Sequence, residues 1–305
     1  MSHSPLQRSP QSALWSVLSS RPVLGALMVV GVLSGAAAWR GLIFIERELT
    51  PLVEDNLLKL FNRPFTLGDL KGYSLTSIEY GRSAIPPHKT TLDGRSFLDR
   101  DQATAESVVV RFNPLTVLFN QTLNLDVTLQ RPQVYLDQAP DNRWIATKVT
   151  SGPEGWLKIR VNTIRAVDGT IKLDPANAPQ RLLQNANGSA TFDREQSRIN
   201  LAATTQIDSG GRIALNGVFQ QETEALSLTA RTENLVLPPL MPLLPPSPVK
   251  VQAGEFDGVL KLAYEPRKPV RLTSQGDYRN AVIDWPAESI SAKARRVKTD
   301  VVVTL

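Results

Sequence analysis

The chain has 305 residues, a formal net charge of +5 and no cysteine, and aromatic residues make up 6% of it. The lack of cysteine excludes disulfides, thiolate metal sites and thiol catalysis. The positive charge fits a membrane surface or another negatively charged partner. Its basic residues are scattered and have few aromatic neighbours for stacking, however, so we expect no nucleic-acid partner.

The first element of the chain is an apolar segment that runs from Pro22 to Trp39 without a charged residue. At about 1.5 Å per residue, a helix of this length nearly crosses a hydrocarbon core of roughly 30 Å. Apolar residues continue beyond Arg40, whose side chain can snorkel toward the headgroups, so we predict a transmembrane anchor over residues 22–45. The residues assigned to this anchor include Pro22, Val29, Val30, Leu33 and Trp39.

The flanks of the anchor predict its orientation. Residues 1–21 contain Arg8 and Arg21 and no acidic residue, whereas the segment after the anchor mixes arginine with glutamate and aspartate. The positive-inside rule then places this tail in the cytoplasm and the rest of the chain outside. Two alternatives stay open: a secretory signal cleaved near residues 36–38, and a plastid transit peptide in the Ser-rich residues 1–20. We favour the uncleaved anchor because the apolar run is longer than a signal-peptide core.

Residues 46–63 are predicted to leave the membrane as an amphipathic helix. Leu49, Leu52 and Leu57 recur near helical spacing, and Pro51 stands where the first turn of a helix tolerates proline. We interpret this segment as a juxtamembrane spacer.

From Pro64 onward the apolar residues recur with a period of two, which is typical of strands. The predicted strands are residues 65–70, 73–80, 103–112, 123–130, 157–162, 198–206, 212–220, 226–231, 256–264, 270–278 and 299–305. Turn signals at Asp168-Gly169, Asn187-Gly188 and Ser209-Gly210-Gly211 are expected to separate strands, and Pro86–Arg100 is predicted to be a loop.

The segment Leu235–Pro248 breaks this pattern because it is apolar and rich in proline. It cannot be an interior strand, since each proline removes a donor from the hydrogen-bond ladder. We expect a short helix or a hydrophobic elbow that connects two repeats.

The alternation gives the predicted sheet one apolar face and one polar face. The side chains predicted to line or underlie the apolar face include Leu123, Leu125, Val127, Leu129, Leu157, Ile159, Val161, Leu226, Leu228, Phe256, Leu260 and Leu262. Such a face can be buried in a sandwich or a closed barrel, or it can line an open, curved sheet that accepts an apolar guest. Periodicity alone leaves these three solutions open.

No catalytic constellation is found in the sequence. The two histidines, His3 and His88, lie in the N-terminal tail and in the predicted loop, so they form neither a triad nor a multi-histidine metal site. Asp168, Asp174 and Asp193 stand at predicted turns, where aspartate is common for backbone reasons. We therefore expect a protein that is not an enzyme and that uses no cofactor or metal.

A series of short motifs follows the anchor in a fixed order. They are residues 41–53 (GLIFIERELTPLV), 62–75 (NRPFTLGDLKGYSL), 81–87 (GRSAIPP), 105–108 with 112–115, 125–129, and 132–138 followed by Arg143-Trp144. Together they resemble the N-terminal region of TamB-like proteins of the AsmA-like superfamily, most closely the cyanobacterial type and its plastid inner-envelope relatives. The likeness covers residues 35–175, and beyond them only the strand pattern supports it.

The resemblance implies an inner-membrane or plastid inner-envelope protein with a periplasmic, U-shaped β-groove of hydrophobic interior. The expected fold is mainly β: a transmembrane helix, an amphipathic helix, and an elongated antiparallel β-groove of β-taco-like repeats. Residues 64–175 correspond to the family's N-terminal β region. Residues 176–305 correspond to further repeats that are cut short, because family members are longer.

The resemblance also implies a function. Such proteins move phospholipid toward the outer membrane, or assist assembly and translocation of outer-membrane proteins with an Omp85-type partner that meets a C-terminal domain missing here. Phospholipid acyl chains and the inner membrane are the other implied partners. Two alternatives remain: a structural tether or interaction scaffold with a closed β core, and an anchored hydrolase.

Overall fold

The computed structural model describes residues 64–304 apart from 93–94, 115, 117–121, 139–157, 177, 194, 196, 244–249, 267 and 286–289. The chain divides into two units, Met1–Val53 and Glu54–Leu305, and all described residues belong to the second. Within this described part, no helix has the length and apolar character needed to cross a bilayer. The predicted anchor and the predicted amphipathic helix lie outside it.

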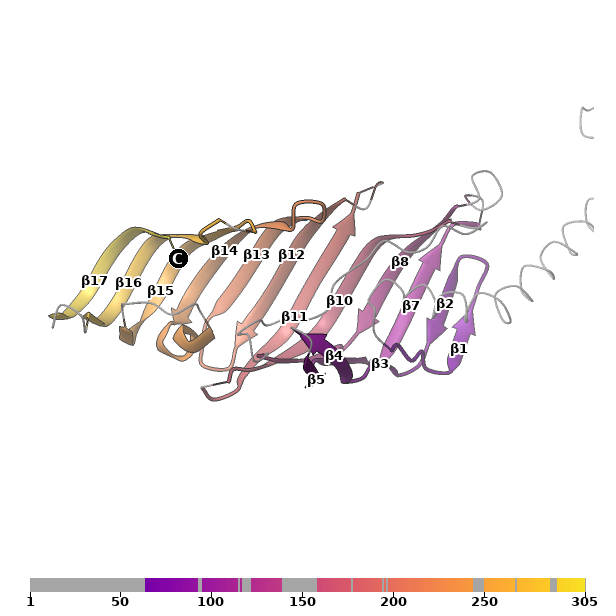
Figure 1. The fold of residues 1–305 in the computed structure, drawn as a ribbon, viewed down its shortest axis with the longest axis horizontal. Helices are drawn as coiled ribbons and strands as arrows, with labels where there is room; N and C mark the ends of the chain where they lie inside the picture. Colours follow the sequence, from indigo (N-terminus) through magenta and orange to yellow (C-terminus); the bar gives the residue numbers. More distant parts are fainter. Residues whose placement is uncertain are drawn as a thin grey trace, which may run out of the picture. The chain divides into compact units, whose positions relative to one another are not determined.

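The described residues form a mainly β fold (Figure 1). Its strands are β1 (Leu70–Tyr73), β2 (Ser77–Tyr80), β3 (Ser83–Ile85), β4 (His88–Leu92), β5 (Arg95–Asp99), β6 (Gln102–Ala105), β7 (Ser107–Phe112), β8 (Thr122–Gln130), β9 (Gln133–Asp137), β10 (Lys158–Asp174), β11 (Arg181–Phe192), β12 (Arg198–Ile207), β13 (Arg212–Gln220), β14 (Ala225–Val236), β15 (Lys250–Tyr264), β16 (Arg271–Trp285) and β17 (Ile290–Thr304). A 3-10 helix, η2 (Pro238–Leu243), follows β14.

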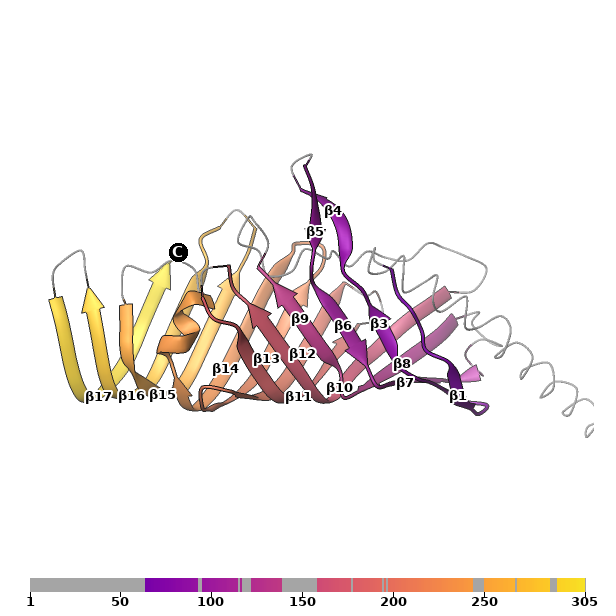
Figure 2. The same ribbon diagram turned by 90° about the horizontal axis from the view of Figure 1, so that it is seen from below.

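Fifteen of the strands form one sheet, and β4 and β5 form a separate hairpin. The main order is β1-β2-β7-β8-β10-β11-β12-β13-β14-β15-β16-β17, and β3, β6 and β9 form a second row that also reaches β10. The strand β10 joins both rows because Lys158–Val167 pairs with β8 and Thr170–Asp174 pairs with β9. We call the row that contains β8 the first wall and the row that contains β9 the second wall (Figure 2).

The two walls meet along a line where the long strands change register. Shifts fall between Ala166 and Gly169 in β10, and at comparable points of β11, β14 and β15. Residues with positive φ mark this fold line: Arg131 (44°), Asp168 (54°), Asn185 (50°), Asn234 (51°), Gly254 (130°) and Asn280 (51°). A bulge bends its strand, and aspartate, asparagine and glycine tolerate the left-handed backbone that the bend requires. The row of bulges therefore creases the sheet along one line.

Most buried apolar side chains lie in two places, and Leu67, Ala105 and Ile199 are buried outside them. On β2, β7, β8 and β10 they are Ile78, Tyr80, Val108, Val110, Leu123, Leu125, Val127 and Val161. Along the fold line they are Ile207, Leu235, Phe256, Tyr278 and Ala281. Burial of large side chains at a bend is stabilising, because each Å² of apolar surface removed from water contributes about 25 cal/mol to the free energy of folding.

Several sequence predictions are confirmed and others are wrong. Residues 123–130 and 212–220 are strands as expected, and Ser209-Gly210-Gly211 is a turn. Asp168-Gly169 and Asn187-Gly188 are not turns, because both lie inside long strands beside the fold line. At Asp168 the left-handed backbone, with φ of 54°, serves a bulge instead of a chain reversal, whereas in β11 the residue with positive φ is Asn185, two residues before Asn187.

The N-terminal strands also differ from expectation. The segment Pro86–Arg100 is largely the β4–β5 hairpin and not a loop. The predicted break at Lys71-Gly72 falls inside β1, and the chain reverses at residues 74–76. The predicted strand over 103–112 is divided at Glu106 between the two walls.

The sheet is not antiparallel throughout, because β10 runs parallel to both β8 and β9. The strand β10 begins in the first wall beside β8 and continues into the second wall beside β9, and it runs in the same direction as both. A parallel neighbour requires a long connection.

Candidate functional site

One face of the first wall carries apolar side chains across six consecutive strands. Residues directly opposite in paired strands point to the same face. The pairing from β11 to β16 aligns a rim row (Phe192, Ile199, Phe219, Leu226, Tyr264), a leucine row (Ala190, Leu201, Gly217, Leu228, Leu262, Leu272) and a small row (Gly188, Ala203, Leu215, Ala230, Leu260, Ser274). We call this surface the inner face.

The leucine row is only half-buried. Leu201, Leu228, Leu262 and Leu272 all keep part of their side chains accessible, and Tyr264 in the rim row is 41% exposed. Large apolar side chains on neighbouring strands that remain in contact with water cost free energy in proportion to their exposed area. A surface of this kind is suited to an apolar partner.

The same face is closed at its other end. Leu123 and Leu125 on β8 are each 2% exposed, and Val161 opposite Leu125 on β10 is 6% exposed. The inner face therefore changes from a buried core on β2–β10 to a surface on β11–β16 that is largely half-buried, with Ile199 of the rim row, 7% exposed, as its buried member.

The residues predicted from the sequence for the apolar face divide accordingly. Leu123, Leu125, Val127, Val161 and Phe256 are buried, and Leu129, Leu226, Leu228, Leu260 and Leu262 are half-buried. Leu157 and the side chain of Ile159 lie outside the described residues, as do the anchor residues Pro22, Val29, Val30, Leu33 and Trp39. The pairing brings the half-buried members of β14 and β15 together, whereas Phe256 belongs to the fold-line core.

Sequence reasoning did not name the inner-face residues of β12, β13 and β16. Leu201, Leu215, Phe219 and Leu272 complete the rows there. The alternation that reveals them was present in the predicted strands, but the face to which each set belongs depends on register.

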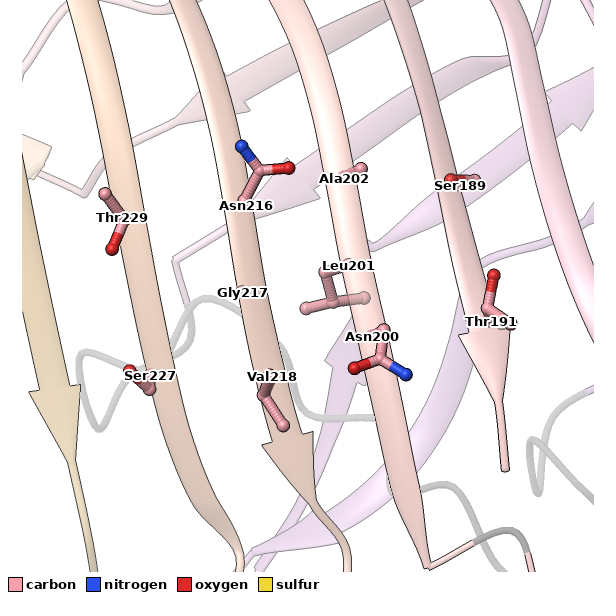
Figure 3. Close-up of a pocket in the computed structure, with 10 residues that line it drawn as sticks. All are labelled: Ser189, Thr191, Asn200, Leu201, Ala202, Asn216, Gly217, Val218, Ser227 and Thr229. Carbon is pink, nitrogen blue, oxygen red and sulfur yellow. The ribbon is translucent and has the colours of Figure 1, made fainter. Parts of the chain in front are cut away.

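The opposite face of the same strands is polar. It carries a shallow depression lined by Ser189, Thr191, Asn200, Ala202, Asn216, Val218, Ser227 and Thr229 of this face, and Leu201 and Gly217 of the leucine row also border it (Figure 3). Asn200, Asn216 and Thr229 are offset by one residue from Leu201, Gly217 and Leu228 of the leucine row, so alternation places them on the other side. The first wall thus has a hydrated outer face and an apolar inner face.

Polar contacts hold the fold line on β14–β16. The Arg279 guanidinium lies 2.6 Å from Asp257 Oδ2 and 3.4 Å from Glu255 Oε2, and it donates to Asn234 Oδ1 at 2.6 Å. The Asn234 N–H donates to Asp257 Oδ1 at 2.6 Å. These contacts pair polar groups at the bulges and connect three strands where they bend, although the buried Nε of Arg279 donates to none of the described residues.

A tyrosine links the two sides of the fold line from within. The Tyr278 hydroxyl on β16 donates a hydrogen bond of 2.7 Å to the carbonyl oxygen of Ala253 on β15. Burial raises the pKa of Tyr278 to about 12. The neutral hydroxyl therefore remains available as a donor throughout the physiological pH range.

The second wall is interrupted beside the hairpin of β12 and β13. Both strands end at the turn that contains Gly211, whose φ is 101° and where a Cβ would lie 2.7 Å from the Asn234 carbonyl oxygen. The helix η2 lies in this region, because Arg181 Nε of β11 donates to the Pro239 carbonyl oxygen at 2.9 Å and Leu240 packs on the fold-line core. The proline-rich segment thus contains a short helix, one of the two forms expected for it, at Pro238–Leu243. The expectation that no part of Leu235–Pro248 is an interior strand is wrong at its start, because Leu235 and Val236 end β14 and pair with β15.

The acidic residues noted in the sequence make structural contacts. The Tyr135 hydroxyl donates to Asp174 at 2.5 Å, Ser197 donates to Asp193 at 2.9 Å, and Asp168 sits at the fold line. Over the residues that the structure describes, no group of three or more histidine, aspartate or glutamate side chains is placed to hold a metal ion.

Comparison of the chain with models of protein families, with curated proteins and with solved structures finds no match. The class of the protein is therefore defined by its own fold. It is a mainly β protein whose principal sheet is creased along one line and whose inner face is apolar.

Proposed function

We propose that the chain is an envelope protein whose creased sheet forms a groove for phospholipid acyl chains. The observation that carries this proposal is the half-buried leucine row on β11–β16, whose opposite face carries serine, threonine and asparagine side chains among smaller apolar residues. An acyl chain on the inner face removes leucine surface from water while the outer face remains solvated.

The dimensions support a lipid tail as the guest. Six strands at about 4.8 Å spacing give a row roughly 24 Å long. A bilayer core of roughly 30 Å holds two leaflets, so one tail extends about 15 Å. The row is long enough for one tail, and it carries no built polar site that a small polar substrate would require.

The ordered motifs of residues 35–175 extend this proposal to a particular kind of protein. We infer a TamB-like chain, anchored in an inner membrane by residues 22–45, with residues 46–63 as a spacer. Its activity is transfer of phospholipid toward the outer membrane, or assembly of outer-membrane proteins with an Omp85-type partner. The inferred architecture is an elongated β-groove of β-taco-like repeats.

The test is lipid extraction and native mass spectrometry on the chain purified from a bacterial envelope. Leu262→Asp places a charge on the inner face, and Ala263→Asp places the same charge on the outer face one residue further along β15. We expect phospholipid to co-purify with the wild type and with Ala263→Asp, and to be reduced several-fold in Leu262→Asp. Circular dichroism confirms that both variants fold. A wild type free of lipid overturns the proposal.

A second candidate function is a structural tether or interaction scaffold. The buried Leu123, Leu125 and Val127 favour it, because on β8 the inner face is a closed core. The same extraction separates the two functions. A scaffold is expected to be compact and to yield no phospholipid in the wild type, in Leu262→Asp or in Ala263→Asp.

A further inference from the structure

The hairpin of β1 and β2, at one end of the sheet (Figure 1), exposes apolar side chains. Leu70 is 36% exposed, Tyr73 is 46% exposed and Leu75, in the turn, is 57% exposed. Large apolar residues with this exposure occur singly elsewhere in the described part, for example Leu98 on β5. Three within six residues form a local apolar patch.

Several polar groups of this hairpin's turn are hydrogen-bonded within the protein. The Ser74 N–H donates to the Ser77 carbonyl oxygen at 2.7 Å, the two serine hydroxyls lie 2.8 Å apart, and the Thr76 N–H donates to Ser74 Oγ at 3.2 Å. The Thr76 carbonyl oxygen accepts from the Phe112 N–H of β7 at 2.9 Å. Each of these pairs lowers the cost of moving the turn from bulk water into the hydrated headgroup region, where the remaining polar groups can still bind water.

The charge of the segment points to the same environment. Residues 73–78 carry no ionisable group except the Tyr73 phenol, and the exposed Lys71 and Glu79 are the charged residues that flank them. Tyrosine prefers the interface between headgroups and acyl chains, where its ring is apolar and its hydroxyl is hydrated.

We propose that the tip of the β1–β2 hairpin, Tyr73 and Leu75, inserts into the headgroup region of a phospholipid bilayer. A membrane fits this tip better than a protein does, because a stable protein interface buries about 800 Å² per partner and three side chains of one hairpin are too few for that. The turn lies at the end of the first wall where β7 finishes. Insertion therefore seats the rim of the sheet on the membrane.

The test uses the full chain, whose lack of cysteine makes single-cysteine labelling specific. Leu75→Cys carries an NBD fluorophore, and the chain is reconstituted in vesicles of phosphatidylcholine and phosphatidylglycerol with or without spin-labelled lipid. Leu98→Cys is the matched control, because Leu98 is 53% exposed and lies on the separate β4–β5 hairpin. We expect blue-shifted emission and quenching by spin-labelled lipid at position 75 and neither effect at position 98.

Each other outcome overturns the proposal. A label at position 75 that is quenched by aqueous iodide as strongly as the label at position 98 shows that the tip stays in water. Equal quenching of both labels by lipid shows general adsorption and no specific insertion. Flotation of the vesicles shows independently whether the chain is bound to the membrane. Lipid extraction tests the groove for acyl chains independently. Failure of the hairpin proposal can therefore be distinguished from failure of membrane binding and from failure of the proposed lipid groove.

Discussion

Phe256 and Tyr278 lie directly opposite each other on β15 and β16, and each ring lies against a glycine of β15. A Cβ on Gly258 would be 2.6 Å from the Phe256 ring, and a Cβ on Gly254 would be 2.5 Å from the Tyr278 ring. The glycines allow both rings to lie close to the sheet and fill the fold line. This pair ties the bend of the strands to the packing of the core.

Gly254→Ala should destabilise the protein strongly. The substitution strains a backbone with φ of 130° and drives a methyl group into Tyr278. We expect the free energy of unfolding to fall by about 1–3 kcal/mol, measured by urea denaturation. Gly72→Ala is the control, because a Cβ there meets no atom within 4 Å. Equal loss in both variants would contradict this account of the fold line.

Leu125→Ala and Leu228→Ala should differ in their effect on stability. Leu125 is 2% exposed, so its truncation leaves a cavity and is expected to cost about 2–5 kcal/mol. Leu228 is half-buried and should cost clearly less, because part of its side chain already meets water. Denaturation curves of the two variants measure the difference. If both cost the same, the inner face is closed along its whole length.

Tyr278 and Tyr135 should ionise at a higher pH than an ordinary tyrosine. Burial raises the pKa of Tyr278 to about 12, and the hydrogen bond to Asp174 raises that of Tyr135 to about 12, both from an ordinary value of 10.0. Because the folded-state pKa is raised, the stabilisation is complete below pH 10 and is lost as pH rises toward 12. Phenolate absorbance checks this: Tyr278→Phe should remove amplitude near pH 12 and leave the amplitude near pH 10 unchanged.

Arg296→Gln should raise the pKa of Asp277. The hydrogen bond from Arg296 at 2.7 Å lowers the pKa of this carboxyl group below its usual value. A lowered pKa gives stabilisation that is present above the usual aspartate pKa and is lost as pH falls through the lowered value. A carbon-13 titration of the Asp277 carboxyl group in each protein measures the shift, and Arg295→Gln, on the neighbouring residue, should leave it unchanged.

Local patterns predicted the strands and their apolar residues better than their arrangement. The alternation at 123–130 reports a strand and its two faces, because side-chain direction is a local property. It does not report that β8 is parallel to β10, because register and partner depend on residues far away in the chain. The half-buried state of Leu228 and the buried state of Leu125 likewise arise from neighbours and not from their own strands.

The same limit explains the misassigned turns. Asp168-Gly169 and Asp93-Gly94 are the same dipeptide, and both permit a left-handed backbone. In β10 this backbone forms a bulge inside a strand, whereas Asp93-Gly94 lies between the paired strands β4 and β5. Two strands separated by two residues of this type are a hairpin signal, but Pro86-Pro87 and the lack of periodicity in this segment are typical of a loop.

The central claim is that the leucine row on β11–β16 contacts lipid, and photo-crosslinking tests it most directly. A benzophenone amino acid is placed at Leu228 on the inner face or at Ser227 on the outer face of β14. The full chain is then irradiated in a bacterial envelope. The account predicts phospholipid adducts at position 228 and none at position 227. Adducts at neither position, or at both to the same extent, would contradict it.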